Sequence, residues 1–461
     1  MATNPADGTV LGTLYGSDAM RAVFAERQWL QYMLDVEAAL ARAQARLGIV
    51  PDAAAKAIVR AARADNLDLE ELAAGTRVTG YPVVALTKAL SRAAGKKSGG
   101  YVHWGATTQD IMDTALVLQI RAGLGIVEKS VARVGRALAA RAVKHRRDVM
   151  AGRTHLQHAL PVTFGYKCAV WTAPLIGDAA RLRALRGRVL KVQFAGAAGT
   201  LASLGKDGRA VTEGLARELG LAAPDAPWHV ARDTLAETAS VLGILCGNLA
   251  KFATDIVLLM QTEVAEVFEP HIPGRGGSST MPQKRNPIAS EYVLAAARGV
   301  QALVPLMLGA MAQDHERGTG PWQAEALALP QIFVLTGGAL EHAAVIAEGM
   351  TVDTARMRKN LDLTQGLIMT EAIMMALAPL IGRDAAHHAV AHACAQALDK
   401  GITVAVALQK EPALKGRVDA ATLKRLADPK GYLGEAEAVV GRVSRAARAA
   451  WGDAGKEKQR S

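Results

Sequence analysis

The chain has 461 residues and a net charge of +11 at neutral pH; half of its residues are apolar, but only 4% are aromatic. This length allows two or three domains, and an aliphatic, alanine-rich composition favours helices packed on helices. The short basic runs at 144–147 and 456–460 are not interleaved with aromatic residues, as a nucleic-acid-binding groove would require. The charge therefore favours a small anionic partner over nucleic acid.

The cysteines and the N-terminus indicate a compartment. Cys168, Cys246 and Cys394 are far apart in the sequence, which argues against a disulfide framework or a zinc site and for a reducing environment. The first residues lack the basic and apolar segments of a secretory signal. The longest uncharged apolar runs, such as 326–340, fall short of a membrane span. We therefore expect a cytoplasmic protein without membrane contact.

The spacing of apolar residues predicts helices along the whole chain. Near the N-terminus one helical face is formed by Trp29, Met33, Val36, Leu40, Ala43 and Leu47, and Gly48 and Pro51 end it. Shorter helical segments follow as far as residue 110. Five long runs come next, at 110–149, 161–192, 228–268, 288–313 and 322–348, and breaks become frequent again after 351.

This pattern predicts an all-α protein in three consecutive parts. We expect an N-terminal helical domain at 1–110, a central bundle of long helices at 111–350 and a C-terminal helical domain at 351–461. Apolar residues on several faces of the long helices favour oligomerisation. We find no alternation of polar and apolar residues long enough to predict a sheet.

A glycine-rich segment separates two of the long helical runs. Residues 273–277 contain three glycines and a proline, so we expect a loop there. Asn286 and Pro287 precede the run at 288–313, where Asn286 can cap the helix and Pro287 can begin it. The loop carries Ser278, and the helix start presents Lys284 and Asn286. This arrangement suits an anion at a helix N-terminus, although an ordinary loop between helices is the alternative.

Two further clusters stand next to long helical runs. Thr107 and Asp110 have the spacing of a capping box, which alone explains them; alternatively, Thr107, Thr108 and Gln109 bind a carboxylate at the helix start. In the second cluster, Arg153, Thr154, His155 and Gln157 crowd into a break between two helices. That setting suits a histidine acting as general acid or base, although a single histidine is more often structural.

The segment 278–287, Ser-Ser-Thr-Met-Pro-Gln-Lys-Arg-Asn-Pro, resembles the signature of the fumarase/aspartase superfamily. The two clusters resemble the other two motif regions of this superfamily, in the same order. The resemblance implies a small N-terminal domain, a central five-helix bundle and a C-terminal helical domain. It also implies a homotetramer with active sites built from three subunits, a small polycarboxylate substrate, and chemistry without a metal or another cofactor.

The resemblance also assigns roles at matching positions. Ser278 would handle the proton alpha to a carboxylate, and Lys284 and Asn286 would bind that carboxylate and stabilise its aci form. His155 would serve the heteroatom side of the bond, oriented by Glu291. The further substrate contacts that it implies are His103, Thr107, Thr108, Gln109, Arg153, Thr154, Gln157, Ser279, Met281, Arg232 and Arg317; the two arginines Arg232 and Arg317 could instead form salt bridges within the bundle.

Within the superfamily, the resemblance is greatest to bacterial cycloisomerases of 3-carboxy-cis,cis-muconate, through segments such as 156–163, 194–200 and 360–366. It implies closure of this diene to carboxymuconolactone, a step of aromatic catabolism in the protocatechuate branch. Tyr81 stands where adenylosuccinate lyases generally carry a histidine, which argues against a purine substrate.

Two alternatives stay open. Some of these cycloisomerases have an aromatic residue where this chain has His155, so a lyase that releases fumarate from a substituted succinate is the second candidate. A catalytically silent structural protein, like the crystallins of this superfamily, is the third. The presence of Ser278, Lys284, Asn286, His155 and Glu291 argues against it.

Overall fold

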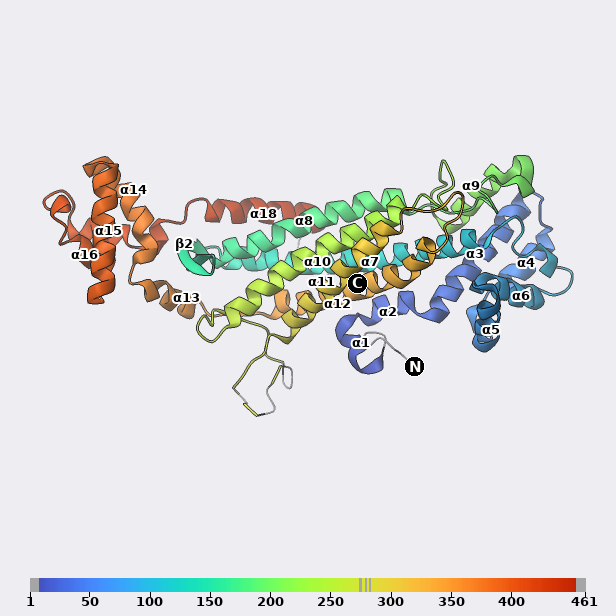
Figure 1. Ribbon diagram of the computed structural model, residues 1–461, viewed down its shortest axis with the longest axis horizontal. Helices are drawn as coiled ribbons and strands as arrows, with labels where there is room; N and C mark the ends of the chain where they lie inside the picture. Colours follow the sequence, from blue (N-terminus) through green and yellow to red (C-terminus); the bar gives the residue numbers. More distant parts are fainter. Residues whose placement is uncertain (1–7, 273–275, 278–279, 282, 453–461) are drawn as a thin grey trace. The chain divides into compact units, whose positions relative to one another are not determined.

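The computed structural model describes residues 8–272, 276–277, 280–281 and 283–452. Helices dominate these residues (Figure 1), and the predicted all-α class is confirmed. The chain forms two compact units, each assembled from three separate segments. Unit 1 comprises Met1–Ser130, Asp178–Leu249 and Tyr292–Glu341, and unit 2 comprises Val131–Gly177, Ala250–Glu291 and His342–Ser461. The three consecutive domains expected from the sequence stay a prediction.

Five long helices form where five long runs were predicted. They are α7 (Thr108–Lys144), α8 (Phe164–Val189), α10 (Asp233–Met260), α11 (Ile288–Gly309) and α12 (Pro321–Gly349). Each contributes residues to both units. Within unit 1, small residues let these helices approach closely. A Cβ atom on Gly123 of α7 would lie 2.7 Å from the ring of Phe333 on α12, and one on Gly243 of α10 would lie 2.9 Å from Val304 on α11.

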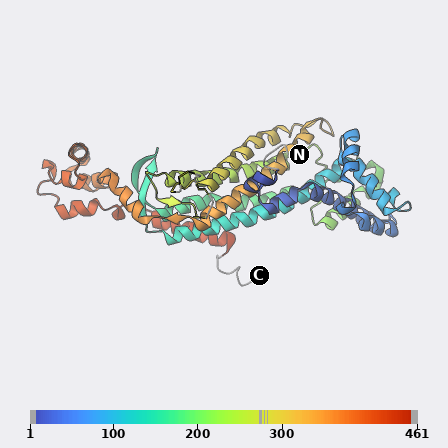
Figure 2. The same cartoon turned by 90° about the horizontal axis from the view of Figure 1, so that it is seen from below.

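The rest of unit 1 is built from shorter helices: α1 (Thr9–Tyr15), α2 (Asp18–Phe24), α3 (Glu26–Arg46), α4 (Asp52–Ala61), α5 (Leu69–Thr79), α6 (Pro82–Ala94) and α9 (Gly208–Leu219). Figure 2 shows α9, in green, beside the blue N-terminal helices, and α3 packs on both α4 and α9. The predicted apolar face of α3 is buried at Met33, Val36 and Leu40, whereas Leu47 lies beyond the helix and is 42% exposed.

Unit 2 contains a β-hairpin that the sequence did not predict. Strand β1 (Val149–Thr154) pairs antiparallel with β2 (Gln157–Thr163), and two-residue strands pair as β3 (Val267–Phe268) with β4 (Thr351–Val352). The expectation that no sheet would form was therefore wrong. The hairpin register shifts between Ala151 and Arg153, so the strands lack the regular alternation by which a strand is recognised.

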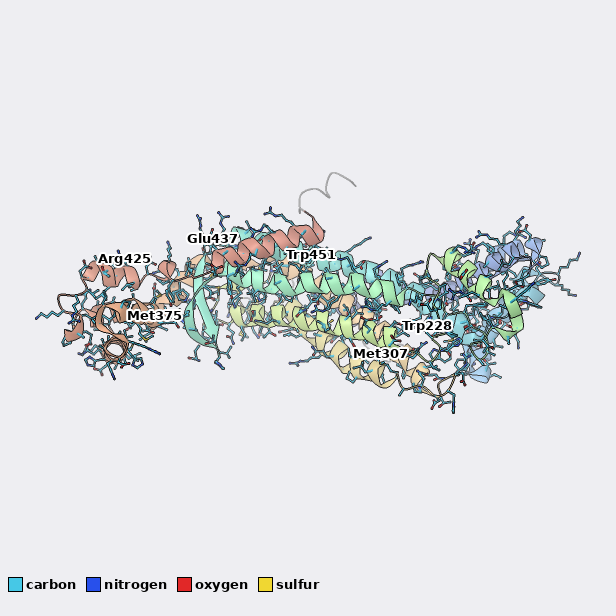
Figure 3. All side chains as sticks on the ribbon, turned by 90° about the horizontal axis from the view of Figure 1, so that it is seen from above. Trp228, Met307, Met375, Arg425, Glu437 and Trp451 are labelled. Atoms are coloured by element: carbon cyan, nitrogen blue, oxygen red, sulfur yellow. The ribbon has the colours of Figure 1, made fainter. Side chains whose placement is uncertain are left out.

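The C-terminal part of unit 2 consists of α13 (Thr354–Leu361), α14 (Thr370–Ile381), α15 (Arg383–Lys400), α16 (Val404–Leu408), α17 (Ala420–Leu426) and α18 (Ala436–Trp451). Short 3-10 turns occur along the described chain at Ala64–Asn66, Gly99–Tyr101, Ala202–Asp207, Asp362–Thr364, Leu367–Met369, Pro412–Leu414 and Pro429–Gly431. Helix α18 carries Glu437 and Trp451 (Figure 3); Arg146 pairs with Glu437 at 3.3 Å, and Arg136 donates to the carbonyl of Trp451.

Three of the long helices, α10, α11 and α12, are long and apolar enough to cross a membrane when only length and composition are considered, and the bent pair Thr354–Thr364 and Leu367–Ile381 would make a fourth. The uncharged apolar runs of the sequence, such as 326–340, are shorter than these helices, which also contain charged residues. In α11 only 28% of the most apolar window is buried within the chain. An apolar surface of α11 that the chain itself leaves uncovered indicates an interaction with another molecule.

Candidate active site

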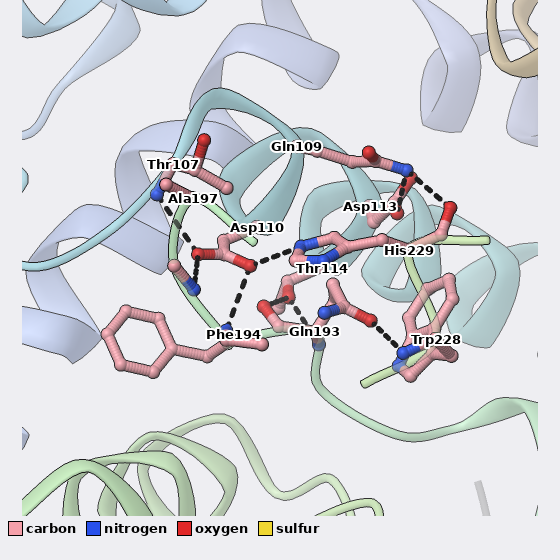
Figure 4. A network of polar contacts seen from close by, with 12 residues as sticks. Thr107, Gln109, Asp110, Asp113, Thr114, Gln193, Phe194, Ala197, Trp228 and His229 are labelled. Carbon is pink, nitrogen blue, oxygen red and sulfur yellow. Dashed lines mark hydrogen bonds and ion pairs between the residues drawn. The ribbon is translucent and has the colours of Figure 1, made fainter. Parts of the chain in front are cut away.

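Two carboxylates near the start of α7 organise the polar interior of unit 1 (Figure 4). Asp110 is fully buried and accepts hydrogen bonds from the backbone N–H groups of Thr107, Ala195 and Gly196, each at 3.0 Å. The Nε2 atom of His229 lies 2.8 Å from the same carboxylate. The bond from Thr107 is the one that a capping box predicts. With four partners, the acceptor capacity of Asp110 is filled.

Asp113, three residues further along α7, is also saturated. Its two oxygens accept from the NH1 and NH2 groups of Arg232 at 2.7 and 3.0 Å. They also accept from Gln109 Nε2 at 3.1 Å and from Trp322 Nε1 at 3.1 Å. Asp113 is 1% exposed, so the four donors replace water completely.

Arg232 was expected either to contact substrate or to form a salt bridge within the bundle, and it forms salt bridges to Asp113 and Glu325. A guanidinium has five N–H donors, and Arg232 makes five hydrogen bonds: two to Asp113, two to Glu325 and one to the carbonyl of Trp228. Its side chain is 1% exposed. Arg232 therefore has no donor left for a ligand. Burial raises the pKa of Glu325, and the cation of Arg232 opposes that rise.

Gln109 and Arg317 form the outer end of this network. The Gln109 amide is fully buried and donates to Asp113 and to the carbonyl of His229 at 2.9 Å, so both of its hydrogens are used. Its Oε1 accepts from Arg317 NH1 at 2.8 Å, and Arg317 NH2 donates to the carbonyl of Ala197. Gln109, also an expected substrate contact, has no donor to spare, whereas Arg317 is only half-buried.

The threonines of the same cluster differ from Gln109. Thr107 and Thr108 are both partly exposed. Within the described residues, neither hydroxyl makes a hydrogen bond to another part of the chain. Both hydroxyls are therefore available at the N-terminal end of α7, where an anion is favoured.

His103 is held by a residue that sequence reasoning missed. Its Nδ1 lies 2.6 Å from Glu37 Oε1, and its backbone N–H donates to Glu37 Oε2 at 3.1 Å. Burial alone would lower the pKa of His103, but the hydrogen bond and charge of Glu37, with the charge of Asp110, outweigh burial and raise the pKa. The backbone of His103 has a φ of 62°, which is uncommon for a residue other than glycine. The sequence contains one sign of this role, because Glu37 is an acidic residue inside an apolar helical run.

His155 stands at the tip of the hairpin in unit 2. Thr154 pairs with Gln157, which leaves His155 and Leu156 as a two-residue turn, with φ of 49° and 64°. Turns with two positive φ values favour Asn-Gly, so a His-Leu turn stores strain. The four residues 154–157 are exposed, and Leu156 is 70% exposed. The turn thus presents the imidazole outward from a rigid hairpin.

Arg153 secures the base of this turn. Its two terminal nitrogens donate to the carboxylate of Glu266 at 2.9 and 2.8 Å, in a bidentate pair. Glu266 is fully buried and also accepts from Asn360 Nδ2 at 2.8 Å. Arg153 was expected to contact substrate, but these bonds hold the hairpin in place. Glu266 could not be paired with Arg153 from the sequence, because the two residues are 113 positions apart.

Of the signature loop, Ser278 and Ser279 lie outside the described residues, so the roles expected for them stay predictions. The loop closes on itself through the bridge between Gly277 and Arg285 and through a bond from Asn286 N–H to the Gly276 carbonyl at 3.2 Å. Lys284 and Asn286 line a cavity of about 190 Å³ together with His271 and Glu269. Met281 and Lys284 are exposed.

The start of α11 is capped by another missed residue. Helix α11 begins at Ile288, and the buried carboxylate of Glu269 accepts from the backbone N–H groups of Ala289 and Ser290 at 3.0 and 2.7 Å. The expectation that Asn286 caps this helix was therefore wrong: a carboxylate from a neighbouring segment satisfies the N–H groups. These groups are consequently not free to hold a substrate anion.

The expected pair of His155 and Glu291 is not formed by this chain alone. Glu291 is exposed in the first turn of α11, and among the described residues no hydrogen bond joins it to His155. Nor do the described residues include three His, Cys, Asp or Glu side chains grouped so as to hold a metal ion.

The motifs and the helical fold agree with comparisons to known proteins. Residues 14–302 match the family described as "Lyase", and residues 366–443 match that described as "Adenylosuccinate lyase C-terminus". The chain is 49% identical over 427 residues to 3-carboxy-cis,cis-muconate cycloisomerase of Pseudomonas aeruginosa, with 92% of this chain and 93% of that protein covered. The chain belongs to the lyase family of the fumarase/aspartase superfamily.

Two solved structures resemble this lyase over almost its full length. The 3-carboxy-cis,cis-muconate lactonizing enzyme from Pseudomonas putida has a TM-score of 0.92 and 44% identity, with 96% of this chain and 100% of that chain covered. A fumarate lyase from Mesorhizobium sp. BNC1 has a TM-score of 0.88 and 46% identity, with 94% and 98% covered. The superfamily and the fold expected from the signature loop are therefore confirmed.

Proposed function

We propose that this lyase-family protein is an enzyme that closes 3-carboxy-cis,cis-muconate to carboxymuconolactone without a cofactor. The observation that carries the proposal is the similarity, over more than nine-tenths of both chains, to proteins with this named activity. In this reaction a carboxylate oxygen of the substrate attacks one carbon of a double bond. The electron pair of that bond moves toward the neighbouring carboxylate, and the alpha carbon then takes up a proton. Tethering the nucleophile to the alkene supplies a high effective molarity.

The signature loop is proposed to carry the proton chemistry. Ser278 delivers the proton to the alpha carbon, and Lys284 and Asn286 stabilise the charge that develops on the aci-carboxylate. In support, Lys284 and Asn286 line one cavity, where the ammonium and the amide can act on one ligand. Ser279 and Met281 are proposed as further substrate contacts from the same segment of the sequence. A serine hydroxyl is a weak acid or base in water, so the role requires a closed site rich in positive charge.

Arg317, Thr107 and Thr108 are proposed to bind a second carboxylate of the substrate. In support, the threonine hydroxyls have no competing partner among the described residues, and Arg317 is the half-buried cation of the network. His103, whose raised pKa favours the imidazolium form, adds positive charge to this region. Gln109 and Arg232 act by holding these groups in position, whereas Arg153 holds the hairpin that carries His155.

We further propose a cytoplasmic homotetramer whose active sites combine residues from three subunits. Two observations support it. The apolar surface of α11 is mostly uncovered within one chain, and His155 and Glu291 are both exposed without contacting each other. In the assembly, Glu291 of one subunit would orient His155 of another, and Thr154 and Gln157 would present the same turn to the substrate.

The second candidate is a lyase that releases fumarate from a substituted succinate. The exposed imidazole of His155 favours it, because a histidine can serve the departing heteroatom in an elimination. The purified protein should be mixed with 3-carboxy-cis,cis-muconate while the ultraviolet absorbance of the diene is followed, with adenylosuccinate and argininosuccinate assayed in parallel for fumarate. Rapid loss of the diene supports the cycloisomerase. Fumarate release with a stable diene supports the alternative.

A further inference from the structure

The polar network of unit 1 is saturated with hydrogen bonds at its centre. The four acceptor positions of Asp113 and the five donors of Arg232 are all used within the chain. The group at the edge of the network is Arg317, which is bound through Gln109. A displacement at the centre is therefore transmitted through Gln109 to the cation proposed to bind substrate.

The orientation of Gln109 is dictated from the inside. Its Nε2 faces two acceptors, the Asp113 carboxylate and the His229 carbonyl. A flipped amide would place its oxygen against these acceptors and its NH₂ group against the guanidinium of Arg317, which can only donate. Asp113 therefore fixes which end of Gln109 points outward. That end is the acceptor that Arg317 requires.

A second route reaches the same residue through the chain. Arg317 lies in the connection between α11 and α12, and the first turns of α12 carry Trp322 and Glu325. Trp322 donates to Asp113, and Glu325 accepts from Arg232 Nε at 2.8 Å, so both anchor this end of the connection to α7 and to the residue that precedes α10. The two routes converge on Arg232 and Asp113. Both residues are almost completely buried.

We propose that Arg232 is a positioning residue: by holding Asp113 and Glu325, it sets the place and the hydrogen bonding of Arg317. That Arg317 binds a substrate carboxylate rests on the proposed function. The effect of Arg232 on the position of Arg317 does not depend on which substrate is bound. The guanidinium of Arg232 is bonded directly to the carboxylates of Asp113 and Glu325. The guanidinium of Arg317 is connected to Asp113 through Gln109. Removing Arg232 leaves Asp113 and Glu325 buried without the cation that they share, and Arg317 at the edge of the network is then drawn inward toward them.

The first test is a double-mutant cycle between Arg232→Lys and Arg317→Ala. A lysine retains the charge but has three donors at one point, so it cannot span Asp113 and Glu325 as a guanidinium does. We expect Arg232→Lys to raise KM for 3-carboxy-cis,cis-muconate roughly tenfold, with a smaller change in kcat. In the Arg317→Ala background, the same substitution should change KM less than twofold, because the residue that it positions is gone. Multiplicative effects in the double variant would overturn the proposal.

A matched control separates positioning from general stability. Asp178 is another fully buried carboxylate of unit 1, bound to Arg181 and Asn248 and without a contact to the network. Asp178→Asn should lower the melting temperature while leaving KM unchanged. If it raises KM as much as Arg232→Lys does, loss of stability accounts for the effect and the proposal fails.

A crystal structure of Arg232→Lys tests the geometry without reference to turnover. The proposal predicts that the bond from Arg317 to Gln109 Oε1 is broken or that the Gln109 amide is flipped. An unchanged Arg317 with the same bond would overturn it. If Arg232→Lys does not fold, a crystal structure of Asp113→Asn provides the same test, because this substitution changes the other member of the ion pair. If the wild-type protein does not convert the diene, the proposed function fails, while the crystallographic result still decides the role of Arg232.

Discussion

The carboxylate of Glu269 caps helix α11 from outside, accepting from the backbone N–H of Ser290 at 2.7 Å and from its hydroxyl at 2.7 Å. Glu269 also precedes the signature loop, and its carbonyl accepts from Arg285 at 2.8 Å. One residue thus joins the start of the loop to the helix at its end. This connection fixes the two ends of the segment that carries Ser278, the proposed proton donor.

Removal of this cap should weaken both stability and activity. Glu269→Ala leaves two buried N–H groups of α11 without an acceptor, so we expect a loss of about 1–2 kcal/mol in the free energy of unfolding. Denaturant unfolding followed by circular dichroism measures it. Glu269→Gln keeps one acceptor and should lose less. Equal stability of the wild type and the alanine variant would show that the cap contributes nothing.

The strained turn at the hairpin tip predicts a stabilising substitution. Leu156 has a φ of 64° and is 70% exposed, so Leu156→Gly relieves strain while removing little packing. We expect a gain of about 0.5–1 kcal/mol in thermal or chemical unfolding. Ala159→Gly in the same hairpin is the control. Ala159 is not among the residues with positive φ, so this substitution should lower the stability of the protein. If Leu156→Gly lowers the stability of the protein, the backbone at Leu156 is not strained in the way proposed.

The pH dependence of stability should report on His103. Because the folded pKa of His103 is raised above its ordinary value, this group stabilises the fold fully below the unfolded pKa of about 6.5, and the contribution is lost as pH rises through the folded pKa. The stability difference between the wild type and His103→Gln should therefore shrink as pH rises above 6.5. Unfolding measured from pH 5 to pH 9 tests this. A stability difference that grows with pH would mean that burial, and not Glu37, has the larger effect on the pKa of His103.

The thiols should differ in reactivity. Burial raises the pKa of Cys168 and raises that of Cys246 to about 12, and both side chains are inaccessible. Cys394 is partly exposed, and burial raises its pKa as well. With a disulfide reagent, the native protein should therefore titrate a single thiol slowly, and all three should react after denaturation. The variant Cys394→Ser identifies the site; rapid native reaction in this variant would contradict the assignment.

Ser278→Ala should nearly abolish turnover, by a factor on the order of 100 to 10,000, because it removes the proposed proton donor. Binding of the diene and assembly of the oligomer should stay intact, because the carboxylate contacts are unchanged. Calorimetry and gel filtration check both. A variant that keeps most of its rate would exclude Ser278 as the acid.

The long helices could be predicted because apolar residues keep helical spacing over 22 to 37 residues, although α8, α11 and α12 each contain a proline. Their ends were less accurate. The first long run was extended to residue 149, but α7 ends at Lys144 and strand β1 begins at Val149. Gly152 inside this strand and a His-Leu turn in place of Asn-Gly hid the hairpin from pattern reasoning.

The candidate site was predicted as far as its motifs extend. The signature loop and the two clusters indicated which residues carry chemistry, but the roles of partners distant in sequence could not be read from them. Glu37 pairs with His103 across 66 residues, and Glu266 pairs with Arg153 across 113. These contacts depend on how helices pack. For the same reason the sequence could not decide whether Arg232 contacts substrate or forms a salt bridge; its five donors are used by Asp113, Glu325 and the carbonyl of Trp228.

The most direct test of the proposed reaction is to convert 3-carboxy-cis,cis-muconate in deuterium oxide and to identify the product by nuclear magnetic resonance. A serine hydroxyl exchanges with solvent, so the account predicts carboxymuconolactone with one deuterium on the carbon alpha to the carboxylate. Unchanged diene, together with fumarate released from a succinyl substrate, would contradict the account and identify the protein as an eliminating lyase.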